Sequence, residues 1–251
     1  MEKINTGTEH LIFEKENGVA VLTMNRPEAR NAMSGEMNEA MRNVLAEVEL
    51  DPHIRCVVLT GAGKGFCAGG DVKGMASSGD GTVGENTIDA AIHRQRVHQR
   101  ATAGKLFKMP KPTIAALPGA AAGAGLSYAL ACDLRIMSSN AIMTTAFAKV
   151  GFSGDYGGSY FMTQLVGSAK ARELYFLSDR VSAEEALSIV YQLLRSGEPP
   201  NLETAQKFIE RIFFNPKKYD LGEVGRYRLN QQFALKVPVE STVLTMDDIV
   251  Q

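Results

Sequence analysis

Two glycine-rich turns in this chain have the residue types that could take part in catalysis. The first runs from Cys67 to Asp71 in "GFCAGGDVKGM", where glycine lets the backbone come close to a ligand. The second lies in "LPGAAAGAGLSYALACD", where a helix is predicted to begin around residues 123–125 and its first N–H groups lack partners. If the turns converge, their N–H groups would hold a developing oxyanion, each contributing about 3 to 4 kcal/mol in the transition state. Taken alone, either turn is more readily explained as an ordinary tight turn, because lone glycine motifs often match by accident.

An aspartate further along the chain could supply the proton acceptor. Asp155 lies in "GFSGDYGGSY", in a turn just before a helix that is predicted to begin near Gly157. An apolar environment would raise the pKa of Asp155 and make its carboxylate a better general base. The alternative is structural, because aspartate at this place also caps helices or forms Asx turns.

The elements that position these residues alternate between strand and helix. Residues 11–24 are predicted to form two strands joined by a hairpin turn at Asn17-Gly18. Ser34 is predicted to cap a helix with one apolar face. This alternation predicts an α/β fold with stacked parallel strands. Further strands are predicted in "CVVLTGAG", "KPTIAAL", "LRIMSS" and "AIMTTA".

Composition limits the class of protein. With 251 residues, 45% of them hydrophobic, the chain can form one large α/β domain or a domain with an appendage. Its net charge of −1 gives no reason to expect a nucleic-acid partner. The three cysteines lack metal-ligand spacing, which predicts buried thiols, a reducing compartment and no metal site. The N-terminus is too polar for a signal peptide and no apolar run is long enough to span a membrane, so we expect a soluble, cytoplasmic protein.

Four stretches, in this order, resemble the crotonase (enoyl-CoA hydratase/isomerase) superfamily over about residues 11–189. The resemblance implies a spiral of repeated ββα units, an acyl-CoA thioester substrate and an enolate-like intermediate. It implies no cofactor apart from the coenzyme A of the substrate, and a homo-oligomer, a trimer or hexamer in the family. The stretches are "NRPEARNAM", "GKGFCAGGDVKGM", "KPTIAALPGAAAGAGLSYALACDLRIMS" and "AFAKVGFSGDYGGSYFMTQLVGSAKARELYFLSDRVSAEEAL".

The resemblance also assigns site residues. It places the two oxyanion N–H donors on Gly70 and Ala124. A basic helix predicted over residues 93–108 would border the acyl pocket. Arg30 or Lys73 would lie near the phosphates of coenzyme A, although either could be a solvated charge. The positions matching those that hold coenzyme A are Ala29, Arg30, Ala68, Gly69, Asp71, Val72 and Lys73.

The catalytic acids of hydratases in this superfamily are absent. The positions matching their two glutamates are Ser127 and Phe147, which leaves both only as substrate contacts. Serine has no useful proton affinity at neutral pH without an activating base, and phenylalanine has none. Asp155 matches an aspartate that several isomerases of the superfamily use as base and that the aryl-CoA dehalogenase uses as nucleophile. The dehalogenase reaction is less favoured here, because the chain has no Trp to hold an aryl ring.

These residues favour an isomerase-like proton transfer by Asp155 over hydration. The alternative is a coenzyme A thioester binder without turnover. A polymerase fragment is a more remote alternative that rests on the last quarter of the chain.

From about residue 190 the chain resembles a segment of the bacterial RNA polymerase beta subunit. The likeness is carried by "R-x-GEPP", "FFNPKKYDLGEVGRYRLN" and "LTMDDIV". It predicts two parts: residues 1–189 as an acyl-CoA-binding core lacking its usual C-terminal helices, and residues 190–251 as a mostly helical foreign tail. The tail is not expected to be an independent domain. The join is predicted near residues 186–191, and the sequence leaves open whether it is natural, engineered or an assembly error.

Overall fold

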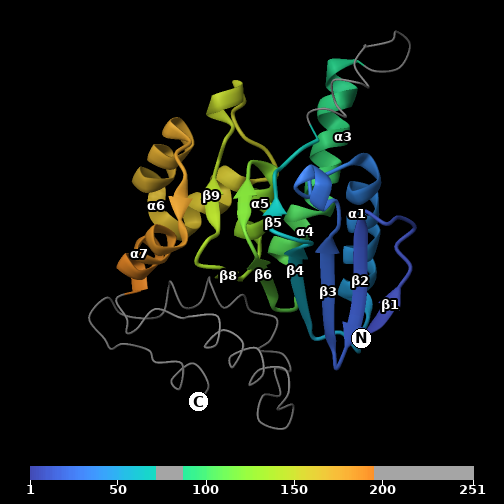
Figure 1. The fold of residues 1–251 in the computed structure, drawn as a ribbon. Coiled ribbons are helices and arrows are strands. Elements are labelled where there is room, and N and C mark those ends of the chain that lie inside the picture. The colour runs from blue at the N-terminus through green and yellow to red at the C-terminus, as the bar shows by residue number, and fades with distance from the viewer. Residues whose placement is uncertain (72–86, 195–251) are drawn as a thin grey trace.

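The computed structural model describes residues 1–71 and 87–194. Its strands form two sheets with helices packed around them, which confirms the predicted α/β class (Figure 1). In spatial order, the larger sheet contains β1 (Glu2–Ile4), β2 (Leu11–Glu16), β3 (Val19–Met24), β4 (Cys56–Gly61), β6 (Thr113–Leu117) and β8 (Leu134–Met137). The smaller sheet contains β10 (Val181–Ser182), β9 (Ile142–Thr144), β7 (Ala120–Ala122) and β5 (Gly65–Cys67).

The helices connect and cover these sheets. In Figure 1, α1 lies beside the first strands, α3 projects away from the sheets, and α6 and α7 lie together at the opposite side. The helices are α1 (Gly35–Leu50), α3 (Ile88–Ala101), α4 (Ala103–Lys108), α5 (Ala124–Ala131), α6 (Gly158–Leu177) and α7 (Ala183–Leu194), with short 3-10 turns η1 (Pro27–Ala29) and η2 (Ala148–Val150).

A ββα repeat organises the chain and places the loops that matter for function. The chain passes from the larger to the smaller sheet at β4–β5, β6–β7 and β8–β9, and each pair of strands precedes helical structure. Strands β4, β6 and β8 pair in parallel, and so do β5, β7 and β9. The carboxyl ends of β5, β7 and β9 therefore lie side by side, and the loops that follow them gather at one edge. No residue pattern in the sequence repeats with these units.

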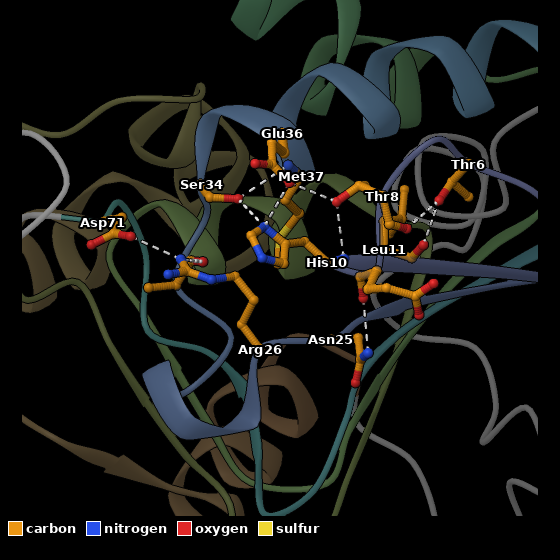
Figure 2. Close-up of polar contacts among 12 residues, drawn as sticks. Thr6, Thr8, His10, Leu11, Asn25, Arg26, Ser34, Glu36, Met37 and Asp71 are labelled. Carbon is orange, nitrogen blue, oxygen red and sulfur yellow. Dashed lines mark hydrogen bonds and ion pairs between the residues drawn. The ribbon is translucent and has the colours of Figure 1, made fainter.

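Two local predictions are confirmed by the backbone. Asn17 and Gly18 join β2 to β3 with φ of +51° and +84°, the left-handed conformation that a two-residue hairpin turn requires. Ser34 caps α1, because its Oγ accepts a hydrogen bond of 3.1 Å from the Met37 N–H. Figure 2 shows this cap beside His10, whose Nδ1 lies 2.8 Å from the same Oγ. The buried face of α1 comprises Met37, Ala40, Met41, Val44, Leu45 and Val48.

Other boundaries differ from the predictions. The basic helix predicted over residues 93–108 is in fact α3 and α4, and α3 begins earlier, at Ile88, with Thr87 as its cap. The two helices meet at Thr102, whose φ of −118° and ψ of −94° are not helical. The Thr102 hydroxyl donates to the carbonyl of His98, four residues earlier, at 2.8 Å. Side-chain hydrogen bonds of this kind compete with the backbone bonds of a helix. The polar segment 76–85, predicted to be mobile, lies outside the described residues.

Two predictions from composition concern the cysteines and membrane segments. The three cysteines are free and buried, as predicted. Burial raises the pKa of Cys67 and of Cys132 to about 12, so both thiols stay protonated. Among residues 1–71 and 87–194, no helix has the length and apolar character needed to cross a bilayer.

Candidate active site

The two glycine turns that could provide N–H groups lie against each other. One turn follows β5 and the other follows β7, and these two strands pair in parallel. Gly69 has a φ of +98°, and a Cβ placed on it would lie 3.0 Å from the Ala122 carbonyl oxygen and 3.3 Å from the Ala124 amide nitrogen. Only glycine fits this approach without strain. The turns therefore converge, as an oxyanion site made from them would require.

Neither candidate N–H has a backbone acceptor in the part of the chain that the structure describes. In the bridge between Met33 and Gly70, the Met33 N–H donates to Gly69 at 2.8 Å and the Asp71 N–H donates to Met33 at 3.3 Å, which leaves the Gly70 N–H unused. Ala124 is the first residue of α5, where N–H groups have no acceptor within the helix. An anion between the turns would find two donors, and the dipole of α5 would add partial positive charge.

A buried asparagine that the sequence reasoning missed holds the first turn in place. Asn31 is fully buried, and its Nδ2 donates to the carbonyls of Ala62 and Gly65 at 2.9 and 2.8 Å. The Cys67 thiol donates to the Asn31 carbonyl at 3.1 Å and accepts from the Gly69 N–H at 3.4 Å. The protonated thiol therefore joins the glycine turn to a rigid buried residue. The sequence around Asn31, "PEARNAMS", carries no pattern that points to this role.

Asp155 is a half-buried residue, and no hydrogen bond of its carboxylate among the described residues gives it a structural role. Helix α6 starts after Gly157 and no side chain caps it, so the alternative that Asp155 is the cap is wrong. Among the described residues, Oδ1 of Asp155 is buried and has no hydrogen-bond partner. Burial raises the pKa of Asp155 to about 6. A carboxylate with an unpartnered oxygen and a pKa of about 6 is suited to accept and return a proton.

Replacing Asp155 by asparagine is expected to stabilise the fold at neutral pH. The folded-state pKa of about 6 exceeds the ordinary value of 3.8, so folding is favoured by this group below pH 3.8 and loses that contribution as pH rises through 6. The amide carries no charge and escapes this penalty. Because the carboxyl is partly exposed, we expect the melting temperature at pH 8 to rise by only about 2 to 4 °C, with no rise at pH 4.

Thermal unfolding at both pH values checks this expectation. Asp179→Asn removes an exposed carboxylate two residues after the end of α6 and should shift neither midpoint. A lower melting temperature for Asp155→Asn at both pH values would show that the carboxylate stabilises its turn after all.

Ser127 connects Asp155 to the second glycine turn. Its side chain is buried, and its Oγ donates to the Asp155 carbonyl at 3.0 Å. Ser127 lies in the first turn of α5, the helix that Ala124 begins, so this hydrogen bond ties the Asp155 turn to the helix that carries the candidate donor Ala124. The hydroxyl is therefore engaged in holding the Asp155 turn. A contact of Ser127 with substrate stays a prediction.

Phe147 fills the space between the second glycine turn and the Asp155 turn. A Cβ on Gly123 would lie 3.7 Å from the Phe147 ring, and one on Gly154 would lie 3.5 Å from it. The ring also stacks on Tyr175, with centroids 6.2 Å apart and planes 9° from parallel. The position that matches a hydratase glutamate is thus an apolar wall beside Asp155. Tyr175 carried no sequence signal.

The structure brings some of the predicted coenzyme A contacts together. Ala29 lies in η1, and the carbonyl of the next residue, Arg30, accepts the Ala68 N–H at 3.0 Å. Arg30 itself is exposed. Asp71 is ion-paired with Arg26, whose Nη1 donates to Oδ2 at 2.8 Å (Figure 2), so this carboxylate has a structural partner. Outside the described residues lie Val72 and Lys73.

A pocket of about 480 Å³ lies next to the Asp155 turn, between α3 and the start of α6. Tyr156, the residue after Asp155, lies in its wall and packs edge-on against His98 of α3 with ring centroids 6.0 Å apart. Helix α3 thus borders a pocket, although its use by an acyl chain stays a prediction. The lining residues are His93, Arg96, Gln99, Arg100, Gly104, Tyr156, Gly157 and Phe161.

Comparison with known proteins identifies relatives of most of the chain. The sequence model of the family described as enoyl-CoA hydratase/isomerase matches residues 14–193. The 1,2-epoxyphenylacetyl-CoA isomerase of Escherichia coli (strain K12) is 35% identical over 210 residues, which cover 83% of this chain and 78% of that protein. The short-chain-enoyl-CoA hydratase of Clostridium acetobutylicum is 36% identical over 212 residues, which cover 82% and 76%. The crystal structure of an enoyl-CoA hydratase from Polaromonas sp. JS666 superposes with a TM-score of 0.63 at 34% identity, covering 71% of this chain and 67% of that one.

A second family model matches the end of the chain. It is described as RNA polymerase Rpb2, domain 2, and it matches residues 168–251. The predicted likeness to RNA polymerase is therefore present, but the match begins upstream of the expected boundary near residue 190. The two family matches overlap over residues 168–193. Residues 195–251 lie outside the described part of the chain.

Proposed function

Because the chain belongs to the enoyl-CoA hydratase/isomerase family, we propose that it acts on an acyl-CoA thioester and moves a proton along the acyl chain with Asp155. The observation that carries the proposal is the Asp155 carboxylate, whose buried Oδ1 has no partner among the described residues, near two converging turns whose candidate N–H groups have no backbone acceptor in the same part of the chain. Coenzyme A enters as part of the substrate, and the proposed reaction requires no separate cofactor.

The proposed reaction shifts a double bond without adding water. The Asp155 carboxylate removes a proton from carbon 2 of a 3-enoyl-CoA, and the electron pair of that C–H bond forms a dienolate whose negative charge rests on the thioester oxygen. The N–H groups of Gly70 and Ala124 stabilise this oxyanion. Asp155 then returns the proton to carbon 4, the double bond moves to carbons 2 and 3, and the thioester carbonyl forms again. One carboxylate suffices because each transfer reverses its protonation state.

The site residues favour this reaction over hydration. Hydration by two acids needs a base for water and an acid for carbon, and the two matching positions hold Ser127 and Phe147. Ser127 donates to a backbone carbonyl, and Phe147 is packed between the second glycine turn and the Asp155 turn. The named relatives include both an isomerase and a hydratase, so relationship alone does not choose between the reactions.

A coenzyme A thioester should bind much more tightly than the matching free acid. The proposed donors recognise a thioester oxygen, and the predicted contacts at Ala29, Arg30 and Ala68 recognise coenzyme A. We expect an enoyl-CoA to bind at least about 100-fold more tightly than the free enoic acid, a difference of about 2.7 kcal/mol. Isothermal titration calorimetry of the full chain, with free coenzyme A as a control, measures this. Equal affinity for both ligands, or no affinity for either, would contradict the proposal.

Binding without turnover is the second candidate function. It is favoured by the absence of both hydratase glutamates at residues 127 and 147. It shares the binding result above and differs only in predicting no product from any 3-enoyl-CoA.

We also propose that the chain joins two parts. Residues 1–189 would be the acyl-CoA-binding core without the usual C-terminal helices, and residues 190–251 an RNA-polymerase-like tail. The support is that the first family match ends at residue 193 while the second continues to residue 251. The alignments with the curated relatives, at 210 and 212 residues, are longer than the span 1–193, so some likeness to them continues into the tail. The homo-oligomer and the cytoplasmic location remain predictions.

Limited proteolysis distinguishes an attached tail from an integrated one. Gly197, Pro199 and Pro200 disfavour helix, so a foreign tail should be cut first near residues 196–201. Mass measurement should then show a resistant fragment that ends near the cut. A tail as resistant as the core would show that it is part of the family fold.

A further inference from the structure

We propose that the pocket between α3 and α6, called here the α3–α6 pocket, binds the far end of the acyl chain, and that this end carries a negative charge. The inference rests on the proposed function, because it assigns a substrate class to the same site. It concerns residues of α3 to which the predicted mechanism gives no role.

Two arginines and a histidine of α3 form one wall of the pocket. His93, Arg96 and Arg100 are spaced by three and four residues, so they lie on one face of α3, and all of them line the pocket. All three are exposed to solvent. A planar guanidinium binds a carboxylate through two parallel hydrogen bonds, which makes arginine well suited to recognise a terminal carboxylate.

No carboxylate among the described lining residues neutralises this wall. The nearest acid on the same helix is Asp89, one turn before His93, and it does not line the pocket. Within residues 1–71 and 87–194, no ion pair engages Arg96 or Arg100. The described hydrogen bond between them joins Arg100 Nε to the Arg96 carbonyl at 3.3 Å, and it leaves the terminal nitrogens of both guanidinium groups available.

The residues that line the pocket from the α6 side include two aromatic side chains. Tyr156 and Phe161 are buried, and both line the pocket from the start of α6. Phe161 packs against Phe107 of α4 with centroids 4.7 Å apart, which fixes this side of the pocket. Aromatic faces favour methylene groups, whereas the arginines favour an anion. The pocket therefore suits a chain that is apolar along its length and charged at its end.

Size and position fit an acyl chain better than the coenzyme A moiety. A volume of about 480 Å³ lies in the range of small-molecule sites and is small for a whole coenzyme A. Tyr156 and Gly157 follow Asp155 directly, so the pocket begins beside the proposed base. The predicted coenzyme A contacts at Ala29, Arg30 and Ala68 do not line it. The thioester would thus lie at the glycine turns, with the far end of the chain at α3.

A matched pair of substrates tests the inference. One is a six-carbon 3-enoyl-CoA that ends in a carboxylate, and the other carries a primary amide in place of that carboxylate. The two differ in charge but little in shape. We expect the full chain to bind the carboxylate form about tenfold more tightly, and to lose most of this preference at high salt because the arginines are exposed.

Charge-removing variants assign the preference to α3. Arg96→Gln and Arg100→Gln should each reduce the preference for the carboxylate, the double variant should abolish it, and Arg96→Lys should retain part of it. Arg172→Gln removes an exposed arginine of α6 outside the pocket and should leave the preference unchanged. Affinity for the amide form should stay within about twofold in all variants, which also shows that they fold.

Three other outcomes of these binding experiments would each contradict a different proposal. Equal affinity of the unaltered protein for both substrates would overturn the inference while leaving the proposed function intact. No affinity for either thioester would overturn the proposed function itself. If the double variant weakened free coenzyme A and both substrates equally, the arginines would serve the coenzyme A phosphates, and the assignment to the acyl end would be wrong.

Discussion

Asp155→Asn should lower the rate of 3-enoyl-CoA isomerisation by about 10² to 10⁴-fold, with substrate affinity little changed. Asparagine keeps the size of the side chain but cannot accept the proton. Because Oδ1 has no hydrogen-bond partner among the described residues, the exchange should disturb few contacts of the turn. Steady-state kinetics should therefore show a fall in kcat at nearly constant KM. Asp179→Asn, the exposed control, should keep full activity.

The same carboxylate should set the pH dependence of the unaltered protein. Asp155 must be deprotonated to act as base, so kcat/KM should rise with pH and level off above its pKa of about 6. At pH 5 the rate should be about tenfold below the plateau, because about one molecule in ten then carries the base form. Full activity in Asp155→Asn, or a flat profile between pH 5 and 7, would leave Asp155 without a catalytic role.

Gly69→Ala is expected to reduce kcat by about 10² to 10³-fold, the loss that follows removal of an oxyanion donor. The added Cβ would lie 3.0 Å from the Ala122 carbonyl and 3.3 Å from the Ala124 nitrogen, so the two turns would have to separate. The donors at Gly70 and Ala124 would then no longer point at one oxygen. Kinetics with a 3-enoyl-CoA, together with thermal unfolding, measure the effect.

Gly151→Ala is the matched control for backbone strain. Gly151 has a φ of +73°, also in the left-handed region, but a Cβ there meets no atom within 4 Å. Both variants should lose about 1 kcal/mol of stability from the unfavourable φ. Only Gly69→Ala should lose activity. Similar kcat values for the two variants would mean that contact between the glycine turns does not matter for catalysis.

Local features of the fold were predictable, whereas contacts between distant segments were not. The Asn17-Gly18 hairpin and the Ser34 cap follow from residues within a few positions of each other, and both were predicted. The parallel pairing of β5 with β7 joins segments about fifty residues apart, through strands of only three residues each. Such short strands have no clear alternation of apolar and polar residues, so propensity alone cannot reveal them.

In the candidate site, too, local features were predictable and contacts between distant segments were not. The glycine turns and Asp155 could be identified because their residue types suggest chemistry. Whether Asp155 caps α6 depended on which N–H groups its oxygens reach, and only coordinates give that. The roles of Asn31 and of the α3 arginines depended on contacts with other segments, so no local pattern indicated them.

The fate of the transferred proton in deuterium oxide tests the central claim most directly. A 3-enoyl-CoA is incubated with the full chain in deuterium oxide, and the products are followed by proton NMR and mass spectrometry. Proton transfer by Asp155 predicts a 2-enoyl-CoA whose carbon 4 carries the proton removed from carbon 2, or deuterium to the extent that the carboxylate exchanges with solvent between transfers, and it predicts no such product from Asp155→Asn. Formation of a 3-hydroxyacyl-CoA without the 2-enoyl product, or equal isomerisation by Asp155→Asn, would contradict the account.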